Sequence, residues 1–171
     1  MGKTLDNTNV AEAKANVSIL TTNNWSTLHY AAKYCKDTTY FFEQIFLLNP
    51  SLLVKRTSGF KSTVLWIAVE AGNIETVRYI LNKTKTLTIK QRFPFVTEED
   101  DGPGLLINAI GGCDREPPLH VAARKGFYDI VELLLEYGAD RSLQNGNKML
   151  ASTIATDDKV LELLYNFPTK K

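Results

Sequence analysis

The sequence predicts an all-α solenoid of about four helix-turn-helix repeats, forming a single domain over residues 1–171. Two observations lead to this prediction. A short segment with a leucine that precedes alanine-rich helix recurs along the chain. Each copy is followed by apolar residues at helical spacing, which is the pattern of a second amphipathic helix. Repetition at a fixed period is typical of architectures in which each unit covers the apolar face of its neighbour.

The recurring segment fixes the repeat boundaries. Its copies read STLHYAA at 26–32, TVLWIAV at 63–69, PPLHVAA at 117–123 and KMLASTI at 148–154. Their leucines, Leu28, Leu65, Leu119 and Leu150, lie 37, 54 and 31 residues apart. The middle interval exceeds a period of about 33 residues by about 21, which predicts an insertion between the second and third repeats.

A second helix is expected in every repeat. Gly138 follows the third of these helices and suits a left-handed residue that ends it. Pro118 fits the first turn of a helix, where its missing N–H is no loss. Asp157 or Asp158 can cap the last helix. The apolar residues that define these helices are Phe42, Ile45, Phe46 and Leu48; Val77, Ile80 and Leu81; Ile130, Val131 and Leu133–Leu135; and Val160, Leu161, Leu163 and Leu164.

These segments resemble the ankyrin signature T-P-L-H-x-A-A, whose period is about 33 residues, and GAD at 138–140 resembles the close of an ankyrin repeat. The resemblance spans roughly residues 24–166 and is strongest over 117–145. It implies short β-hairpin-like fingers between repeats. It also implies that His29 and His120 are structural and hydrogen-bond the backbone of an adjacent loop. Trp66 stands in the histidine position of the second repeat. The sequence therefore does not decide whether this repeat makes the corresponding hydrogen bond to the adjacent loop.

The remaining segments are read as caps and an insertion. Residues 1–23 are expected to form an N-terminal cap with a short helix, because Asn9 and Glu12 have capping-box spacing. Residues 167–171 are a tail. The insertion near 83–104 carries basic residues, the apolar run FPFV at 93–96 and the acidic run 98–101. The charges favour a segment that folds back with internal ion pairing, although the apolar run could instead dock on the solenoid or on a partner. We expect the insertion to help define the partner site.

The sequence offers little for catalysis. It lacks nucleophile-elbow, zinc-protease and phosphate-loop motifs, and Gly111-Gly112 fits a hairpin tip better than a phosphate cradle. Cys35 and Cys113 form no C-x-x-C pair. The net charge of +1 and the short apolar runs point neither to nucleic acid nor to a membrane. We therefore expect no enzyme activity, no catalytic residue, no cofactor and no metal.

The resemblance implies protein recognition by an adaptor or scaffold, which we expect to be monomeric and cytoplasmic. In the family, partners contact the fingertips and the exposed face of the inner helices. Aromatic and arginine side chains are favoured anchors there, which favours Trp25, Tyr34, Phe60 and Arg124. The full set of expected partner-binding residues is Trp25, Lys33, Tyr34, Phe60, Ser62, Glu70, Asp114, Glu116, Arg124 and Lys125.

Other readings remain open at this point. The chain could be a regulatory or targeting region of a larger enzyme. It could be an effector that a host-associated bacterium secretes into the host cytosol. Trp25 could pack against the N-terminal cap, and Phe60 could pack between fingers, rather than contact a partner.

Overall fold

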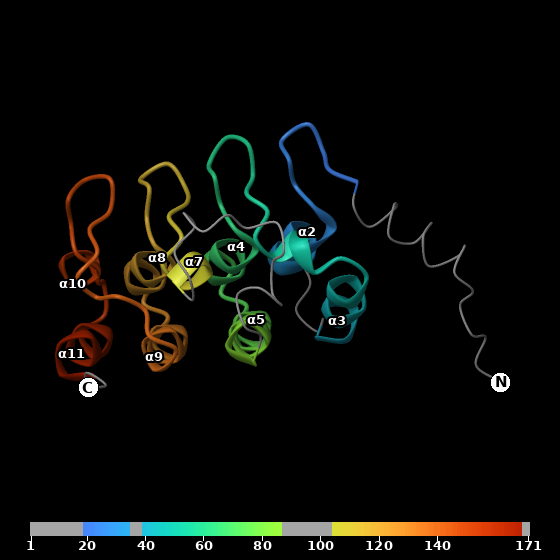
Figure 1. Cartoon of the computed structure of the whole chain (residues 1–171). Helices are drawn as coiled ribbons and strands as arrows, with labels where there is room; N and C mark the ends of the chain where they lie inside the picture. The colour runs from blue at the N-terminus through green and yellow to red at the C-terminus, as the bar shows by residue number, and fades with distance from the viewer. Residues whose placement is uncertain (1–18, 35–38, 87–103, 169–171) are drawn as a thin grey trace, which may run out of the picture.

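The computed structural model describes residues 19–34, 39–86 and 104–168, and these form two layers of helices (Figure 1). Four loops stand side by side above the inner layer, one immediately before each inner helix. We call these loops the fingers and number them in chain order. Each inner helix packs against the next one along the row. The inner helices are α2 (Thr27–Tyr34), α4 (Val64–Glu70), α8 (Pro118–Lys125) and α10 (Ala151–Ile154). The outer helices are α3 (Thr39–Leu48), α5 (Ile74–Thr86), α9 (Tyr128–Glu136) and α11 (Asp158–Asn166).

Small residues let the inner helices approach closely. The paired alanines of the recurring segment, among them Ala32, Ala68 and Ala122, are fully buried. Leu28, Leu65 and Leu119 are also buried, so one hydrophobic cluster continues from the first repeat into the fourth. Each repeat buries its apolar face against a neighbour, as the sequence predicted.

Turn and cap residues behave as expected from their chemistry. Gly126 ends α8 and Gly138 follows α9, with φ of +69° and +88°, a left-handed conformation that is costly for residues with a Cβ. Asp157 caps α11, because its carboxylate accepts the backbone N–H groups of Lys159 and Val160. The sequence predictions for Gly138 and for an aspartate cap are therefore confirmed.

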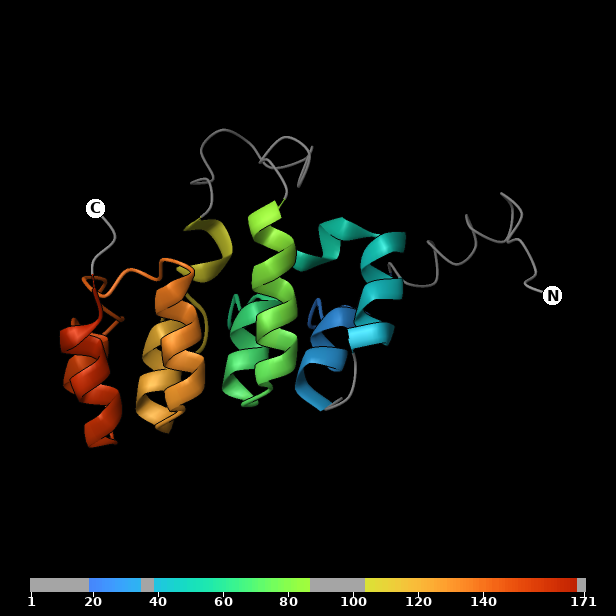
Figure 2. The same cartoon turned by 90° about the horizontal axis from the view of Figure 1, so that it is seen from below.

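Figure 2 shows the outer helices from below. Most of the apolar residues that defined these helices in the sequence are buried, whereas Leu48, Leu161 and Leu163 are partly exposed. Phe42, Ile45, Val77, Ile80 and Val160 are each at most 3 % exposed. Two short elements complete the core. The 3-10 helix η1 (Pro50–Leu53) packs beside α3, and α7 (Gly104–Ile107) packs beside α4.

The register expected for the fourth repeat is wrong by two residues. Leu150 was aligned with Leu119, but Leu150 is the N-cap of α10 and therefore corresponds to Pro117, the N-cap of α8. This segment has lost the T-P-L-H residues that fix the alignment elsewhere. The fourth finger is instead defined by a backbone bridge between Gln144 and Leu150.

The insertion begins later than its expected start at residue 83. Lys83 belongs to α5, which continues to Thr86. Its ammonium pairs with Glu43 of α3 at 3.1 Å. The predictions for residues 87–103, and the N-terminal helix predicted within 1–18, lie outside the described residues.

Candidate protein-binding surface

Backbone hydrogen bonds join the four fingers into one continuous edge. At every junction an N–H of the later finger donates to a carbonyl oxygen of the earlier one. The three bonds are Ser58 to Asn23 at 2.9 Å, Gly112 to Phe60 at 2.9 Å and Gly146 to Asp114 at 2.7 Å. Because no finger stands alone, the fingertips form a preorganised surface.

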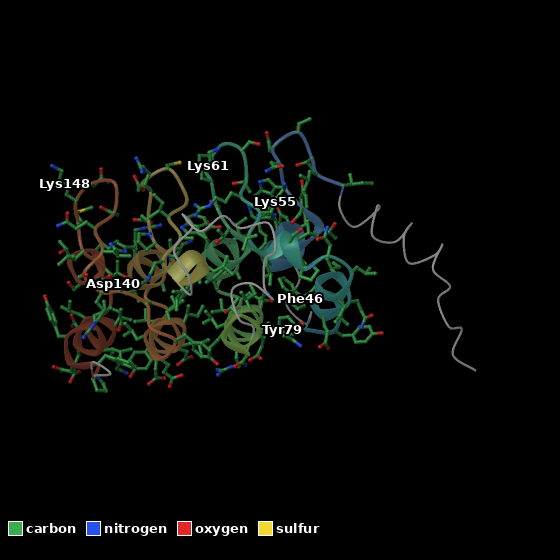
Figure 3. All side chains as sticks on the ribbon, in the orientation of Figure 1. Phe46, Lys55, Lys61, Tyr79, Asp140 and Lys148 are labelled. Carbon is green, nitrogen blue, oxygen red and sulfur yellow. The ribbon has the colours of Figure 1, made fainter. Side chains whose placement is uncertain are left out.

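Each finger contains one non-glycine residue in the left-handed region. It lies three residues before the first residue of an inner helix in every repeat. Apart from an asparagine in the first finger, the residue is basic. These residues are Asn24 (φ 60°), Lys61 (φ 52°), Arg115 (φ 50°) and Lys148 (φ 58°). Equivalent backbone positions therefore present a cation at three successive fingertips, and Figure 3 labels Lys61 and Lys148 there.

A second set of bonds joins the inner helices to the fingers. His120 Nε2 lies 3.0 Å from the carbonyl oxygen of Met149 in the next finger. Trp66 occupies the equivalent position one repeat earlier, and its indole N–H donates to the carbonyl oxygen of Glu116 at 2.8 Å. The bond that the sequence left open in repeat two is therefore made by the indole.

Both histidines are fully buried and suited to structure rather than proton transfer. Burial lowers the pKa of His29 to about 4, although the backbones of Ser62 and Lys55 oppose this shift. Burial also lowers the pKa of His120, against the backbone hydrogen bond to Met149. Both rings are neutral at neutral pH.

The indole of Trp66 requires glycine in the finger beside it. A Cβ at Gly112 would lie 2.6 Å from Trp66 Cζ2, and the φ of Gly112 is +74°. A Cβ at Gly111 would lie 2.9 Å from the backbone of Ser62. The Gly111-Gly112 pair therefore allows close backbone and ring packing in the third finger.

An aromatic groove lies between the first two fingers and the end of α2. It has a volume of about 370 Å³ and its lining includes Trp25, Tyr30, Lys33, Tyr34 and Phe60. The Trp25 and Tyr30 rings are tilted with centroids 5.1 Å apart, and Tyr30 stacks on Tyr34 at 6.3 Å. Lys33 Nζ lies 5.4 Å from the Trp25 ring and 5.5 Å from the Tyr34 ring.

A basic groove of about 430 Å³ continues toward the third finger. Arg56, Lys61 and Arg115 line it, together with exposed Cys113 and the backbone around Gly111. The guanidinium of Arg56 donates to the carbonyl oxygen of Ile110 at 3.0 Å and so helps to hold the second and third fingers together.

The expected partner-binding residues differ in how far they are exposed to solvent. Lys33, Tyr34, Phe60, Asp114, Arg124 and Lys125 are exposed, whereas Trp25 and Glu70 are partly exposed. Four of them, Trp25, Lys33, Tyr34 and Phe60, meet in the aromatic groove.

Ser62 and Glu116 differ from the expectation, because both are only 3 % exposed. Each belongs to the base of a finger rather than its tip. The hydroxyl of Ser62 accepts the N–H of Gly112 at 3.3 Å. The carboxylate of Glu116 pairs with Arg124. Their side chains therefore hold the finger and are not available for direct partner contact.

Arg124 serves the scaffold as well as the surface. Its Nη2 lies 2.9 Å from Glu116 Oε2, and the Glu116 side chain is only 4 % exposed against 41 % for Arg124. The hydrogen bond to Glu116 raises the pKa of Arg124, with smaller contributions from Asp114 and Glu70. Only part of the guanidinium is available to a partner.

The sequence did not predict several residues of this surface, among them Tyr30, Lys61 and Arg115. Tyr30 lies four residues before Tyr34 on one helix, a spacing that places both on one face and could have revealed it. Lys61 and Arg115 occupy the same position in successive fingers. Each lies four residues before the leucine of its repeat, Leu65 or Leu119, so the sequence alignment contained this signal, whereas aligning on the helix starts is needed to add Lys148.

A larger hollow of about 890 Å³ lies between α9 and α11, and none of the expected partner-binding residues line it.

The described part of the chain contains no group of three or more His, Cys, Asp or Glu side chains that could hold a metal ion. No described helix is long and apolar enough to span a bilayer.

The stacked helix pairs, the joined fingers and the grooved edge define a repeat domain of the protein-binding class. The family model for ankyrin repeats (3 copies) matches residues 28–145. The chain belongs to the ankyrin-repeat family, whose domains generally serve as non-enzymatic protein-interaction modules. No curated protein matches the sequence.

Proposed function

We propose that this protein is a monomeric adaptor or scaffold that binds a partner protein through its fingertips and the exposed face of its inner helices. The observation that supports this proposal most strongly is the aromatic groove. Tyr34 and Phe60 are well exposed at its edges, while Trp25 and Tyr30 form its wall. Clustered exposed aromatics on a rigid surface are typical of binding anchors.

Preorganisation adds to the proposal. Binding a partner costs less when the contact residues are already ordered. The bond from Ser58 to Asn23 fixes the spacing of the first two fingers, and Asn24 Nδ2 donates to the carbonyl oxygen of Arg56 between the same fingers. The groove therefore requires little ordering when a partner enters it.

The test is an affinity capture of partner proteins with the immobilised full chain. It compares the wild type with two variants. Tyr34→Ala combined with Phe60→Ala removes the exposed groove aromatics. Tyr165→Ala is the matched control, because Tyr165 on α11 is 69 % exposed and Tyr34 is 67 % exposed. We expect one or more proteins, quantified by mass spectrometry, to bind the wild type and the control but not the groove variant.

Circular dichroism and thermal melting establish that both variants are folded, as expected for exposed side chains. A partner that the folded groove variant retains at the wild-type level would refute the groove as the binding site.

A further inference from the structure

The aromatic groove and the basic groove meet at the tip of the second finger. Gly59 and Phe60 line both of them. An extended chain that follows the fingertips would therefore pass from an aromatic environment into a basic one without leaving the surface.

The basic side of this path has little opposing charge. Lys61, Arg115 and Lys148 form no ion pair with any carboxylate in the described residues. Glu116 is buried against Arg124, which leaves Asp114 as the exposed acid of the third fingertip. The fingertips thus present a row of basic groups.

The outer side of α9 and α11 carries more acidic than basic groups. Asp129 and Glu136 on α9 and Asp158 and Glu162 on α11 are exposed there, with Lys159 as an exposed cation among them. A negatively charged partner would be repelled from this side and attracted to the fingertips.

We propose that the partner segment is an extended acidic peptide with one aromatic or long aliphatic anchor residue. The anchor enters the groove between Trp25, Tyr34 and Phe60. Its aspartate or glutamate residues face Lys61 and Arg115, with Lys148 farther along the row. This inference rests on the proposed function and specifies the chemistry of the partner.

A peptide fits this surface better than a nucleic acid does. Lys33 Nζ lies over one face of the Trp25 ring and one face of the Tyr34 ring, which leaves room for a single anchor side chain but not for a run of bases stacked on both rings. A nucleic acid carries a charge at every phosphate and would meet the exposed carboxylate of Asp114 beside Arg115, whereas a peptide can place an uncharged residue there.

The test begins with a phage-displayed library of random peptides selected against the full chain. We expect the enriched peptides to combine an aromatic, leucine or methionine anchor with nearby aspartate or glutamate. A selected peptide then serves as a fluorescent probe for anisotropy titrations. Its amide counterpart (Asp→Asn, Glu→Gln) and its anchor→Ala counterpart should each bind at least about tenfold more weakly.

Charge-reversed variants of the protein locate the site. Lys61→Glu and Arg115→Glu should each weaken the acidic probe about tenfold or more, and added salt should reduce the difference. Lys159→Glu on α11 is the matched control and should bind like the wild type. Cys113 supplies an independent readout, because bound peptide should slow its alkylation as followed by peptide mass spectrometry.

Each contrary result has a distinct meaning. Neutral or basic binders that are lost in Phe60→Ala would overturn the acidic preference but leave the proposed function standing. Acidic binders unaffected by every fingertip variant would overturn both the inference and the groove. Enrichment of no peptide, or tighter binding of a single-stranded oligothymidine than of any peptide, would also overturn the inference.

Discussion

The indole N–H of Trp66 donates to the carbonyl oxygen of Glu116 at 2.8 Å, and His120 makes the corresponding contact to Met149 one repeat later. The two side chains differ in size, and the third finger accommodates the larger one with Gly111 and Gly112. The exchange of histidine for tryptophan therefore preserves the junction between adjacent repeats.

Trp66→Phe should lower the free energy of unfolding by about 0.5–1.5 kcal/mol, because it removes one of the two donors to the Glu116 carbonyl oxygen, which keeps the N–H of Gly111, and retains most of the ring packing. Urea denaturation followed by circular dichroism measures the change. Tyr165→Ala on the exposed face of α11 is the control and should stay within about 0.5 kcal/mol of the wild type. Equal stabilities for Trp66→Phe and the wild type would mean that the indole bond contributes nothing.

Arg124→Ala should destabilise the fold by about 1–3 kcal/mol. The substitution leaves the buried Glu116 carboxylate without its partner, and the exposure of Arg124 reduces the cost below that of a fully buried pair. Lys125→Ala, its exposed neighbour, should be nearly neutral. Adding Glu116→Gln to Arg124→Ala should recover part of the loss, because it removes the uncompensated charge. A double variant no more stable than Arg124→Ala would contradict this account.

Stability should fall as the pH falls from about 6.5 toward 4. The folded protein holds the pKa of His29 at about 4 because burial disfavours the imidazolium, whereas the unfolded ring titrates near 6.5. Below pH 6.5 the unfolded chain binds a proton that the folded protein does not, so the loss at pH 4 reaches about 3 kcal/mol. His120 contributes in the same direction.

Proton NMR of the histidine rings checks this pKa directly, since the chain contains 2 histidines. Selective assignment with His120→Gln identifies the His29 signal. An imidazole of His29 that titrates near pH 6.5 in the folded protein would contradict the prediction.

Lys148→Gly should raise the free energy of unfolding by about 0.5–1 kcal/mol. A residue with a Cβ is strained by roughly 1–2 kcal/mol at the left-handed φ of 58°, and glycine removes that strain while adding entropy to the unfolded chain. Thermal melting compares this variant with Lys125→Gly, which places glycine within α8 and should be destabilising. A lower melting temperature for Lys148→Gly would refute the strain argument.

Periodicity was sufficient to predict most of the fold. Alanines and leucines recur because two helix layers must pack, so the helix pairs could be predicted from composition and spacing. The structural role of the histidines was implied by the resemblance to the ankyrin signature; His120 makes the implied bond to the next finger, whereas the hydrogen bonds of His29 Nδ1 are to Ser26 in its own turn. The fourth repeat was harder, since Leu150 resembles Leu119 in type but serves as an N-cap.

The binding surface was less predictable, because exposure depends on how each finger folds. Glu116 is two residues from Asp114, yet one is buried against Arg124 while the other is exposed. The repeat pattern predicted which residues lie in the fingers, but it did not predict which of their side chains point toward solvent. That choice depends on backbone conformation at Arg115 and on the pairing of Gly111 with Glu116.

The junctions between fingers all run in one direction and follow one another along the length of the domain. A pulling force on the two ends of the solenoid would load these bonds in series, so the weakest junction would give way first. Side chains support each junction: Asn24 donates to the Arg56 carbonyl oxygen at the first, Arg56 donates to that of Ile110 at the second, and His120 contacts that of Met149 at the third. Mechanical extension would therefore separate the fingers one after another rather than all together.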